Sequence, residues 1–390
     1  MNFKTISLRL QNNSQFKSSA YPNEPLCKLK DFNLENKFHK NLDFSFKIKN
    51  SFSEKPWIPT FFQDHINNFK GYYLFEEDLC NKINNVTYST NFCIFDKSIF
   101  HYLSFTRNSL QTKPLMILLA GLNLSSLSQY YSNIDNLLDH YNIIALDLLN
   151  SGGSSSSNEA SISSTIDNLE ICLAAITGSK PFEIVAHSIS CFYAIKLVPR
   201  LKLNISKVLA FSPVGVGYTA SFMDIILTYK CINFILKRCV FPKNKFQNIL
   251  EYNAGRGNVP DHLTNSTQLA YSVDTNRHPL DCIINIINQR NQLNFSSDEI
   301  NILKNKNTFL FFGETDTVVT DHHYDFAKSI GLNVSKIKTG HVPNLDPSFN
   351  FVKFLNSLKL DERKINDLSL PKIHDFSRKL VTDKYIMRES

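Results

Sequence analysis

Residues 182–191 read FEIVAHSISC, a short apolar run that leads into Ser188 and then into a helix-length segment. We predict a buried strand over 182–187 and a helix after it, joined by a sharp turn at the serine. A serine at such a turn has a strained backbone and an exposed hydroxyl, which is the geometry of a nucleophile. The usual pattern is G-x-S-x-G, and here the similarly small Ala186 and Ser190 replace both glycines. Taken alone, A-x-S-x-S favours a serine that only caps a buried helix.

The same alternation of short apolar strands and helix-length segments extends along most of the chain. The predicted strands are 86–95, 99–106, 114–120, 142–147, 182–187, 206–211, 308–312 and 333–338. The predicted helices are 61–84, 127–140, 163–177, 189–200, 322–330 and 347–358. Continuously apolar strands separated by helices are typical of a mostly parallel central sheet that helices cover on both faces. The sequence therefore predicts an α/β fold.

One long insertion interrupts this alternation. Residues 214–303 are helical and Asn-rich in pattern, and we expect them to form a helical cap. The α/β core is then expected in two parts, 61–213 and 304–360. Residues 1–60 show no sustained periodicity and are expected to be a poorly ordered extension, whereas 361–390 form a charged C-terminal tail.

The order of three residues along the chain changes the interpretation of Ser188. A serine nucleophile needs a histidine as base and a carboxylate that orients it. In folds of this class they follow in the order Ser, Asp or Glu, His, each at the carboxyl end of a strand. Asp316 follows the strand at 308–312, 128 residues after Ser188, and His341 follows the next strand 25 residues later. We therefore predict the catalytic triad Ser188, Asp316 and His341.

Other residues near these positions compete with this assignment. Glu314 and Asp321 flank Asp316 but fit the turn less well. Residues 321–325 read DHHYD and could instead bind a metal ion, although a tight local cluster without a distant ligand is a weak metal site. We expect its two histidines, His322 and His323, to be helix-start or surface residues, and we expect no metal and no organic cofactor.

Acyl transfer also needs N–H donors for the oxyanion. We expect one from Ile189, directly after the nucleophile, and the second from the loop after the third strand, where Gly121 permits a tight turn and Leu122 is the candidate donor. In the following loop, Asn150 can adopt a left-handed backbone and take a turn position usually held by glycine. His187 is expected to be a strand-end residue beside the nucleophile.

Composition and charge exclude several classes of protein. The chain has 390 residues, of which 43% are hydrophobic and 20% charged, so it can bury a sizeable core. Its net charge of +7 is concentrated in residues 1–50, which hold nine Lys or Arg and four Asp or Glu. The near-neutral remainder argues against a nucleic-acid-binding face. The eight cysteines never form C-x-x-C, which argues against a zinc site or a disulfide framework.

The N-terminal sequence bears on the compartment. It does not contain the apolar stretch of a secretory signal peptide, and no apolar run is long enough to span a bilayer. Residues 1–23 contain Lys4, Arg9 and Lys17 but no acidic residue, and are rich in Ser and Asn. That composition fits a mitochondrial transit peptide or simply a basic arm. We expect a cytoplasmic protein at the periphery of an organelle membrane, with a mitochondrial location as the alternative.

One segment of the expected cap is strongly apolar. Residues 221–241 read SFMDIILTYKCINFILKRCVF, with a narrow polar stripe of Lys230, Asn233 and Lys237. Such a helix either packs against the core or acts as a lid that dips into a lipid surface. Both interpretations stay open, because a lid can do each in turn.

Over about residues 85–358 these motifs resemble the α/β-hydrolase fold and, within it, α/β-hydrolase-domain subfamily 4/5. That group contains lysophospholipases and N-acylphosphatidylethanolamine lipases, a lipolysis coactivator with reported lysophosphatidic acid acyltransferase activity, and fungal mitochondrial cardiolipin deacylases. The matching stretches are WIPT at 57–60, DLL at 147–149, SPVGV at 212–216, YNA at 252–254, RHPL at 277–280 and HVPNLD at 341–346. WIPT is the more discriminating motif. HVPNLD supplies His341 and Asp346, the H-x-x-x-x-D pattern that the subfamily associates with acyltransferase activity.

The resemblance has departures as well as a functional implication. Ala120, Ala186 and the pair Ser190-Cys191 stand where the subfamily has His or Gly, but the chain keeps Ser188, which the lipolysis coactivator does not have. The resemblance therefore implies a serine hydrolase that cleaves or transfers an acyl group of a phospholipid or lysophospholipid. It also implies contact with a membrane or lipid-droplet surface through the cap. The alternative is a catalytically silent, lipid- or membrane-associated interaction protein on the same fold.

Overall fold

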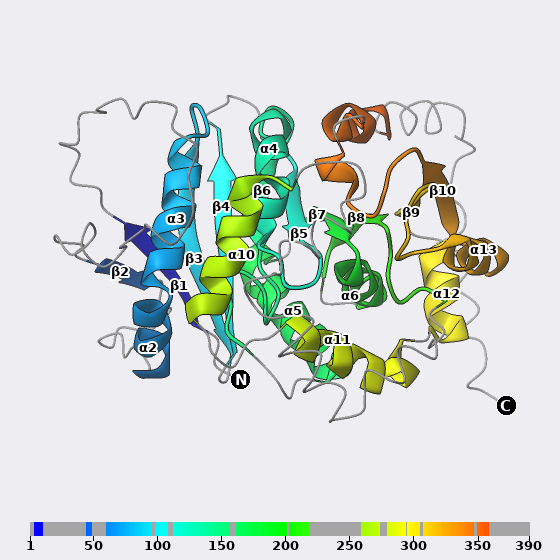
Figure 1. Cartoon of the computed structure of the whole chain (residues 1–390), viewed down its shortest axis with the longest axis horizontal. Helices are drawn as coiled ribbons and strands as arrows, with labels where there is room; N and C mark the ends of the chain where they lie inside the picture. Colours follow the sequence, from blue (N-terminus) through cyan, green and yellow to red (C-terminus); the bar gives the residue numbers. More distant parts are fainter. Residues whose placement is uncertain are drawn as a thin grey trace, which may run out of the picture. The chain divides into compact units, whose positions relative to one another are not determined.

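The computed structural model (Figure 1) describes residues 4–10, 44–48, 60–95, 98–107, 112–156, 161–178, 180–200, 203–217, 259–273, 279–293, 295–304, 307–346 and 349–358. The chain divides into two units, Met1–Phe349 and Asn350–Ser390. The first carries the sheet and every residue discussed below. The second contains a helix over residues 351–358, where the sequence predicts one over 347–358.

The first unit is built on one mixed sheet, with the strand order β10-β9-β8-β7-β5-β6-β4-β3-β1-β2 in the described residues. The pairs from β10 to β6 are parallel, and β4, β3, β1 and β2 continue the sheet antiparallel. The predicted mostly parallel α/β core is confirmed. The strands are β1 (Lys4–Leu10), β2 (Phe44–Ile48), β3 (Thr87–Phe95), β4 (Ser98–Thr106), β5 (Leu115–Leu119), β6 (Asn142–Leu146), β7 (Phe182–His187), β8 (Ile205–Phe211), β9 (Thr308–Gly313) and β10 (Asn333–Ile337).

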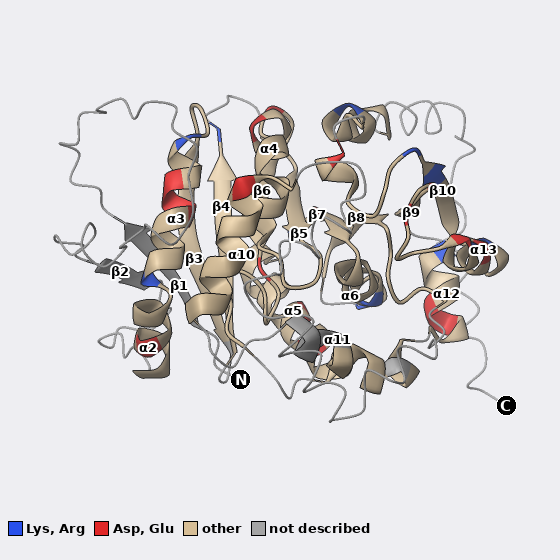
Figure 2. Cartoon of the chain, viewed as in Figure 1, with Lys and Arg blue, Asp and Glu red and all other residues tan. Residues whose placement is uncertain are grey.

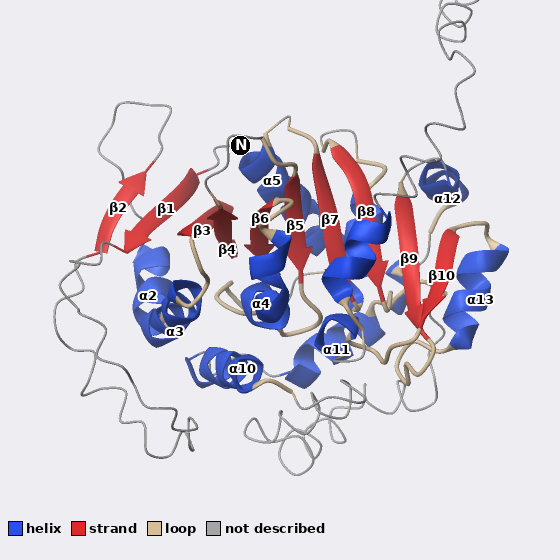
Figure 3. Cartoon of the chain, turned by 90° about the horizontal axis from the view of Figure 1, so that it is seen from above, coloured by secondary structure: helices blue, strands red, loops and turns tan. Residues whose placement is uncertain are grey.

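Helices cover both faces of this sheet. The chain moves one way along the sheet from β5 to β6 and back the other way from β6 to β7, so right-handed crossovers place the connecting helices α4 and α5 on opposite faces (Figure 3). Each of these two helices begins after a serine N-cap, Ser125 or Ser161, whose side chain accepts a backbone N–H three residues on. The helices are α2 (Thr60–Asn68), α3 (Lys70–Asn81), α4 (Ser126–Leu137), α5 (Ile162–Thr177), α6 (Ile189–Leu197), α10 (Asp261–Val273), α11 (Pro279–Asn288), α12 (Ser297–Lys304) and α13 (Asp321–Ser329), with 3-10 turns η4 (Arg290–Gln292) and η5 (Pro343–Leu345).

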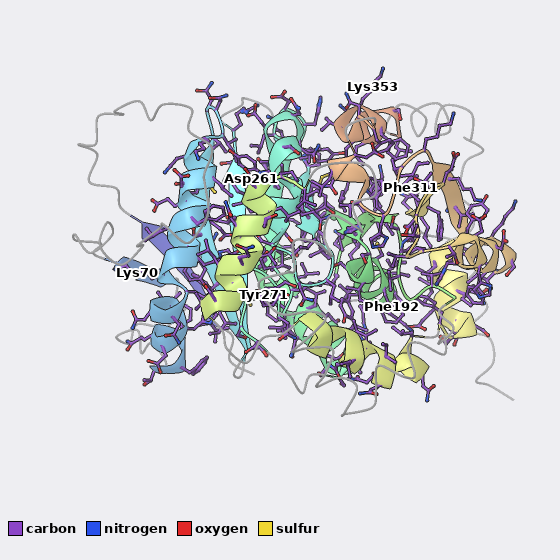
Figure 4. All side chains as sticks on the ribbon, viewed as in Figure 1. Lys70, Phe192, Asp261, Tyr271, Phe311 and Lys353 are labelled. Carbon is purple, nitrogen blue, oxygen red and sulfur yellow. The ribbon has the colours of Figure 1, made fainter. Side chains whose placement is uncertain are left out.

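The largest hydrophobic cluster lies between the parallel strands and the helices that connect them. β5, β6 and β7 are buried over nearly their whole length, as expected of strands that helices cover on both faces. Phe192 of α6 belongs to this cluster, and Phe211 of β8 stacks on Phe311 of β9; Figure 4 labels Phe192 and Phe311. Helix α6 packs against β7 and β8.

Between β8 and β9 the described residues form α10, α11 and α12, within the segment predicted as the cap. In Figure 3, α10 and α11 lie beyond the arrowheads of the parallel strands. Leu263 of α10 packs with Ala120 and Leu124, which lie in the loop after β5. The predicted helix over 221–241 lies outside the described residues. Among those that are described, no helix combines the length and apolar character needed to cross a bilayer.

Two stretches of the N-terminal region differ from expectation. The predicted helix over 61–84 is two helices, α2 and α3, which join at Phe69 and pack on β3 and β4 through Phe62, Tyr72 and Phe92. The expected poorly ordered extension contains β1 and β2, and β1 pairs antiparallel with β3. The segment KTISLRL of β1 does alternate between polar and apolar residues, which is the signal of a strand.

Figure 2 shows Lys and Arg interspersed with Asp and Glu along the described helices and strands. Several form ion pairs, such as Lys196 with Glu299 and Arg200 with Asp167. Partly exposed pairs of this kind each contribute about 0–1 kcal/mol to stability.

Candidate active site

Ser188 lies at the turn between β7 and α6, with backbone angles φ 57° and ψ −125°. Non-glycine residues rarely adopt positive φ, so the turn is strained. Hydrogen bonds hold it in place, because the Ser188 N–H donates to Phe211 O at 2.9 Å and the Ser188 carbonyl accepts from Cys191 N at 3.1 Å. The predicted sharp strand-to-helix turn at Ser188 is confirmed.

The two residues that replace the usual glycines around Ser188 are fully buried. Ala186 ends the apolar part of β7, and Ser190 lies in the first turn of α6. The Ser190 hydroxyl donates a hydrogen bond to the carbonyl of Ala120, directly after β5. Glycine could not make this bond, so Ser190 adds a link between the helix that follows the nucleophile and the loop after β5.

Asp316 follows β9 in a loop that lies against the loop after β10. The Thr315 N–H donates to Thr339 O at 3.1 Å. Gly313 permits this close approach, because a Cβ at that position would lie 2.5 Å from Gly340 O. The two loops that carry Asp316 and His341 are therefore packed backbone against backbone.

His341 lies between Ser188 and Asp316. Its Nε2 is 3.1 Å from Ser188 Oγ, and its Nδ1 is 2.9 Å from Asp316 Oδ2 and 3.1 Å from Oδ1. With the ring proton on Nδ1 facing the carboxylate, Nε2 is left to accept the serine hydroxyl proton. The structure thus brings together the three residues whose order along the chain predicted a triad.

The surroundings of the Asp316 carboxyl keep it ionised, so that it can hold this tautomer of His341. Its side chain is fully buried, and Oδ1 also accepts the N–H groups of Val318 and Val319 at 2.8 and 2.9 Å. Burial opposes ionisation, but the hydrogen bond and charge of His341, together with the two amides, outweigh it and lower the pKa of Asp316. The carboxylate stays ionised and orients the imidazole.

His187 is a second buried histidine at this site. Its ring centroid lies 5.0 Å from that of His341, and its Nε2–H donates to His341 O at 2.8 Å. Burial, with the neighbouring His341, lowers the pKa of His187 to about 3. The ring is therefore neutral and acts as a fixed donor. The prediction of a strand-end residue is confirmed, but its contact with His341 is new.

The two predicted oxyanion donors lie close to the nucleophile turn in the fold. Ile189 directly follows Ser188, and Leu122 lies in the loop after the neighbouring strand β5. Ile189 is the first residue of α6, where N–H groups have no intrahelical partner and carry the positive end of the helix dipole. Leu122 lies in residues 120–124, here called the oxyanion loop, which turns through Asn123 at φ 64° and a hydrogen bond from Leu124 N to Gly121 O. We find no acceptor for either the Leu122 or the Ile189 N–H among the described residues.

A pocket opens beside these two residues. The cavity has a volume of about 40 Å³. Polar and apolar side chains contribute to its lining in similar measure. The lining residues are Leu122, Leu148, Leu149, Asn150, Ser151, Ile162, Thr165, Ile189, Tyr193, Asn285 and Ile286. Asn285 and Ile286 belong to α11, so the cap region forms one wall.

A second cluster of titratable groups, which the sequence does not predict, shares no residue with the triad. Glu76 of α3, His101 of β4 and Asp147 after β6 are all buried, with ligand-type atoms within 4.8 Å of one another. His101 Nδ1 is 2.9 Å from Asp147 Oδ2, while Tyr72 and Ser125 donate to Glu76 Oε1. Burial, with the nearby Asp147 carboxylate, raises the pKa of Glu76 to about 7.

This cluster has the residue types of a metal site but fits a proton better. Asp147 already accepts the N–H groups of Ser126 and Gly153 in addition to His101. That leaves His101 Nε2 and Glu76 Oε2 as the atoms open to an ion, whereas structural zinc takes four ligands. One proton shared between these two atoms, which lie 3.3 Å apart, satisfies both.

The remaining predicted residues are placed as follows. Asn150 adopts the expected left-handed backbone, with φ 66°. Asp346, of the H-x-x-x-x-D pattern, is buried and directly follows η5. His322 and His323 lie in the first turn of α13, and His323 Nδ1 is 3.4 Å from Thr320 Oγ1.

No family model and no curated protein sequence matches this chain. Solved structures do match. A membrane phospholipase A, described as a bacterial virulence factor, matches with TM-score 0.57 and 16% identity over 77% of this chain and 95% of that one. A 2-hydroxy-6-oxo-6-phenylhexa-2,4-dienoate hydrolase from Rhodococcus sp. strain RHA1 matches with TM-score 0.55 and 14% identity over 72% and 99%. A serine hydrolase involved in carbazole degradation matches with TM-score 0.52 and 16% identity over 70% and 100%. With the strand order above, these likenesses show that the chain has the α/β-hydrolase fold.

Proposed function

We propose that this chain is a serine hydrolase that cleaves, or transfers, an acyl group of a phospholipid or lysophospholipid. The observation that carries the proposal is the position of His341, with Nε2 3.1 Å from Ser188 Oγ and Nδ1 on the Asp316 carboxylate. A buried serine that merely capped α6 would need neither a histidine nor an ionised carboxylate behind it.

The proposed chemistry uses these atoms directly. Ser188 Oγ attacks the acyl carbonyl as His341 Nε2 takes its proton, and the N–H groups of Leu122 and Ile189 hold the oxyanion. His341 then gives the proton to the leaving-group oxygen. Water activated by His341 hydrolyses the acyl-serine and completes the cycle.

Two features support a lipid acyl group as the substrate. Six of the eleven residues that line the small cavity are Leu or Ile, and Leu122 and Ile189 are among them, so an acyl chain attached to the reacting carbonyl would meet apolar side chains there. The motifs at 147–149, 212–216 and 341–346 also resemble those of α/β-hydrolase-domain subfamily 4/5. If a lysolipid hydroxyl replaces water in the second step, the same residues perform acyl transfer, which is the activity associated with the His341 and Asp346 pattern.

A fluorophosphonate probe tests the catalytic part of this proposal. We expect it to label the parent protein at Ser188, and Ser188→Ala to abolish labelling and reduce kcat by about 10⁶. Ser212→Ala is the matched control, because Ser212 follows the neighbouring strand β8 with φ 50° and has no described hydrogen-bond partner for its hydroxyl. A parent protein that is not labelled would instead support a silent interaction protein on this fold.

A substrate panel tests the lipid part. We expect hydrolysis of phospholipid or lysophospholipid to exceed that of a soluble short-chain ester at equal acyl concentration. Activity on the soluble ester alone would contradict the lipid assignment. We also propose peripheral attachment to an organelle membrane, with mitochondria as the alternative; fractionation of cells and flotation with anionic liposomes test this part independently of turnover.

A further inference from the structure

Two buried amide side chains connect the oxyanion loop to the loop that carries His341. Gln129 lies on α4 with no exposed surface, and Asn344 lies in η5. Gln129 Oε1 accepts the N–H of Gly121 at 2.8 Å, and Gln129 Nε2 donates to Asn344 Oδ1 at 3.2 Å. Asn344 Nδ2 donates back to Gln129 O at 2.5 Å.

The backbone groups at the ends of this bridge fix both amide orientations. The Gly121 N–H can only donate, so the oxygen of Gln129 must face it, and the Gln129 nitrogen then faces Asn344. The Gln129 carbonyl can only accept, so the Asn344 nitrogen must face it. Reversing either amide would leave a buried N–H against a donor, which makes the bridge a single defined arrangement.

The bridge ends next to groups that act in the proposed chemistry. Gly121 directly precedes the Leu122 donor, and Asn344 lies three residues after His341. His187 at the end of β7 contacts both loops. It donates a hydrogen bond to His341 O, and its Nδ1 faces Gly121 so closely that a Cβ on residue 121 would lie only 2.6 Å from it. Residues 338–346 are here called the histidine loop, and Gln129 links this loop to the oxyanion loop.

We propose that Gln129 and Asn344 are positioning residues that hold the Leu122 N–H in register with His341, an inference that rests on the proposed serine hydrolase function. Neither residue touches the reacting atoms. Each acts by fixing a loop, so that the oxyanion donor and the general base keep one mutual geometry. A misplacement of about 1 Å at a reacting group can reduce the rate by about 10².

The alternative is that the two amide side chains contribute only to the stability of the fold. Thr177 provides a matched control, since it is buried near the end of α5 and donates to Leu173 O at 2.8 Å, within its own helix. Thr177→Val removes one buried hydrogen bond without touching either loop. Gln129→Met and Asn344→Leu remove the bridge with little change in side-chain volume.

Kinetics separate positioning from stability. We expect each single variant to lower kcat on a soluble ester by about 10- to 100-fold with KM within about twofold, and to slow fluorophosphonate labelling in proportion. The double variant should be no more than about threefold slower than the slower single variant, because both substitutions break one bridge. Losses that multiply independently, or that do not exceed the loss in Thr177→Val, would overturn the proposal.

Hydrogen exchange tests the coupling without relying on turnover. In Asn344→Leu we expect faster exchange in the oxyanion loop, and in Gln129→Met faster exchange in the histidine loop, with no change at either loop in Thr177→Val. Exchange that accelerates only next to each substitution would overturn the coupling. If the parent protein is not labelled at Ser188, the proposed function fails, and the exchange arm still decides whether the two loops are coupled.

Discussion

The Nε2 atom of His101 lies 3.3 Å from Oε2 of Glu76, and neither atom has another hydrogen-bond partner in the described part of the chain. Both side chains are buried, and His101 Nδ1 already faces Asp147. Without a proton between them, two lone pairs would face each other in a cluster with two buried carboxylates. We therefore interpret the pair as holding one proton that ties α3 to β4.

This shared proton predicts that stability falls as pH rises. Burial raises the pKa of Glu76 to about 7; burial alone would lower the pKa of His101, but Glu76 and Asp147 raise it. A group whose pKa is higher in the folded state stabilises it fully below the unfolded value and loses this effect as pH rises through the folded value. We expect the free energy of unfolding to fall by about 3 kcal/mol between about pH 4.5 and pH 7.5.

Glu76→Gln separates this effect from other titrations. The amide does not ionise, so the pH dependence should flatten in the variant, as measured by denaturant unfolding at several pH values. Asp78→Asn is the control, because Asp78 lies on the same helix with its side chain 64% exposed and pairs with Lys82. Its profile should follow that of the parent. If the free energy of unfolding of Glu76→Gln still falls steeply with pH, another group causes the effect. Titratable groups near the cluster include Tyr72, Tyr73, His65 and Asp147.

The same cluster predicts how the protein responds to a chelator. Because a proton satisfies His101 and Glu76, we expect EDTA to change neither turnover nor the midpoint of thermal unfolding. His322→Ala combined with His323→Ala should also be nearly neutral, since both histidines lie at the start of α13. A lower midpoint of thermal unfolding after chelation would place a metal at the Glu76 cluster. Loss of turnover without that change would instead support a metal site at residues 321–325.

Asp316→Asn tests the orienting carboxylate. The amide can present its N–H to His341 Nδ1 and favour the wrong tautomer, so we expect kcat to fall by about 10⁴ with little change in KM. Asp321→Asn is the matched control, because Asp321 starts α13, is 77% exposed and pairs with Lys336. Steady-state kinetics on a soluble ester compares them. If Asp321→Asn were the more damaging change, the assignment of the acid would be wrong.

The triad and the core strands could be predicted because their signals are local or ordered along the chain. Ser188 and Asp316 each follow an apolar run, and His341 follows the alternating segment NVSKI of β10, so parallel strands bring their carboxyl ends to one edge. Asn150 was predictable from its backbone tolerance alone. These inferences need no knowledge of which distant side chains meet.

The features that the sequence does not predict depend on contacts between side chains that are far apart along the chain. Gln129 and Asn344 are 215 residues apart. Gln129 stands in no motif, and the HVPNLD stretch that contains Asn344 does not mark that residue as polar core. Glu76 lies in a helix whose sequence predicts one apolar face, yet it is buried because Tyr72, Ser125 and His101 surround it. The sequence does not predict β1, because a single alternating strand is a weak signal until an edge such as β3 is available to pair with it.

The contact between Gly121 and His187 gives the last prediction. A Cβ at residue 121 would lie 2.6 Å from His187 Nδ1 and 3.5 Å from the Cβ of Ser188. The imidazole of His187 cannot easily retreat, because its Nε2 donates to His341 O. Gly121→Ala should therefore displace the oxyanion loop or His341 and lower kcat by about 10², with about 1–3 kcal/mol of lost stability from overpacking.

Gly71→Ala is the control, since Gly71 lies within α3 with nothing within 4 Å of the added methyl. That variant should gain about 0.5–1 kcal/mol of stability and keep the parent's kcat. Thermal unfolding and ester kinetics on both variants check this, and a Gly121→Ala enzyme with the parent's kcat would mean that His187 does not hold the geometry of the site.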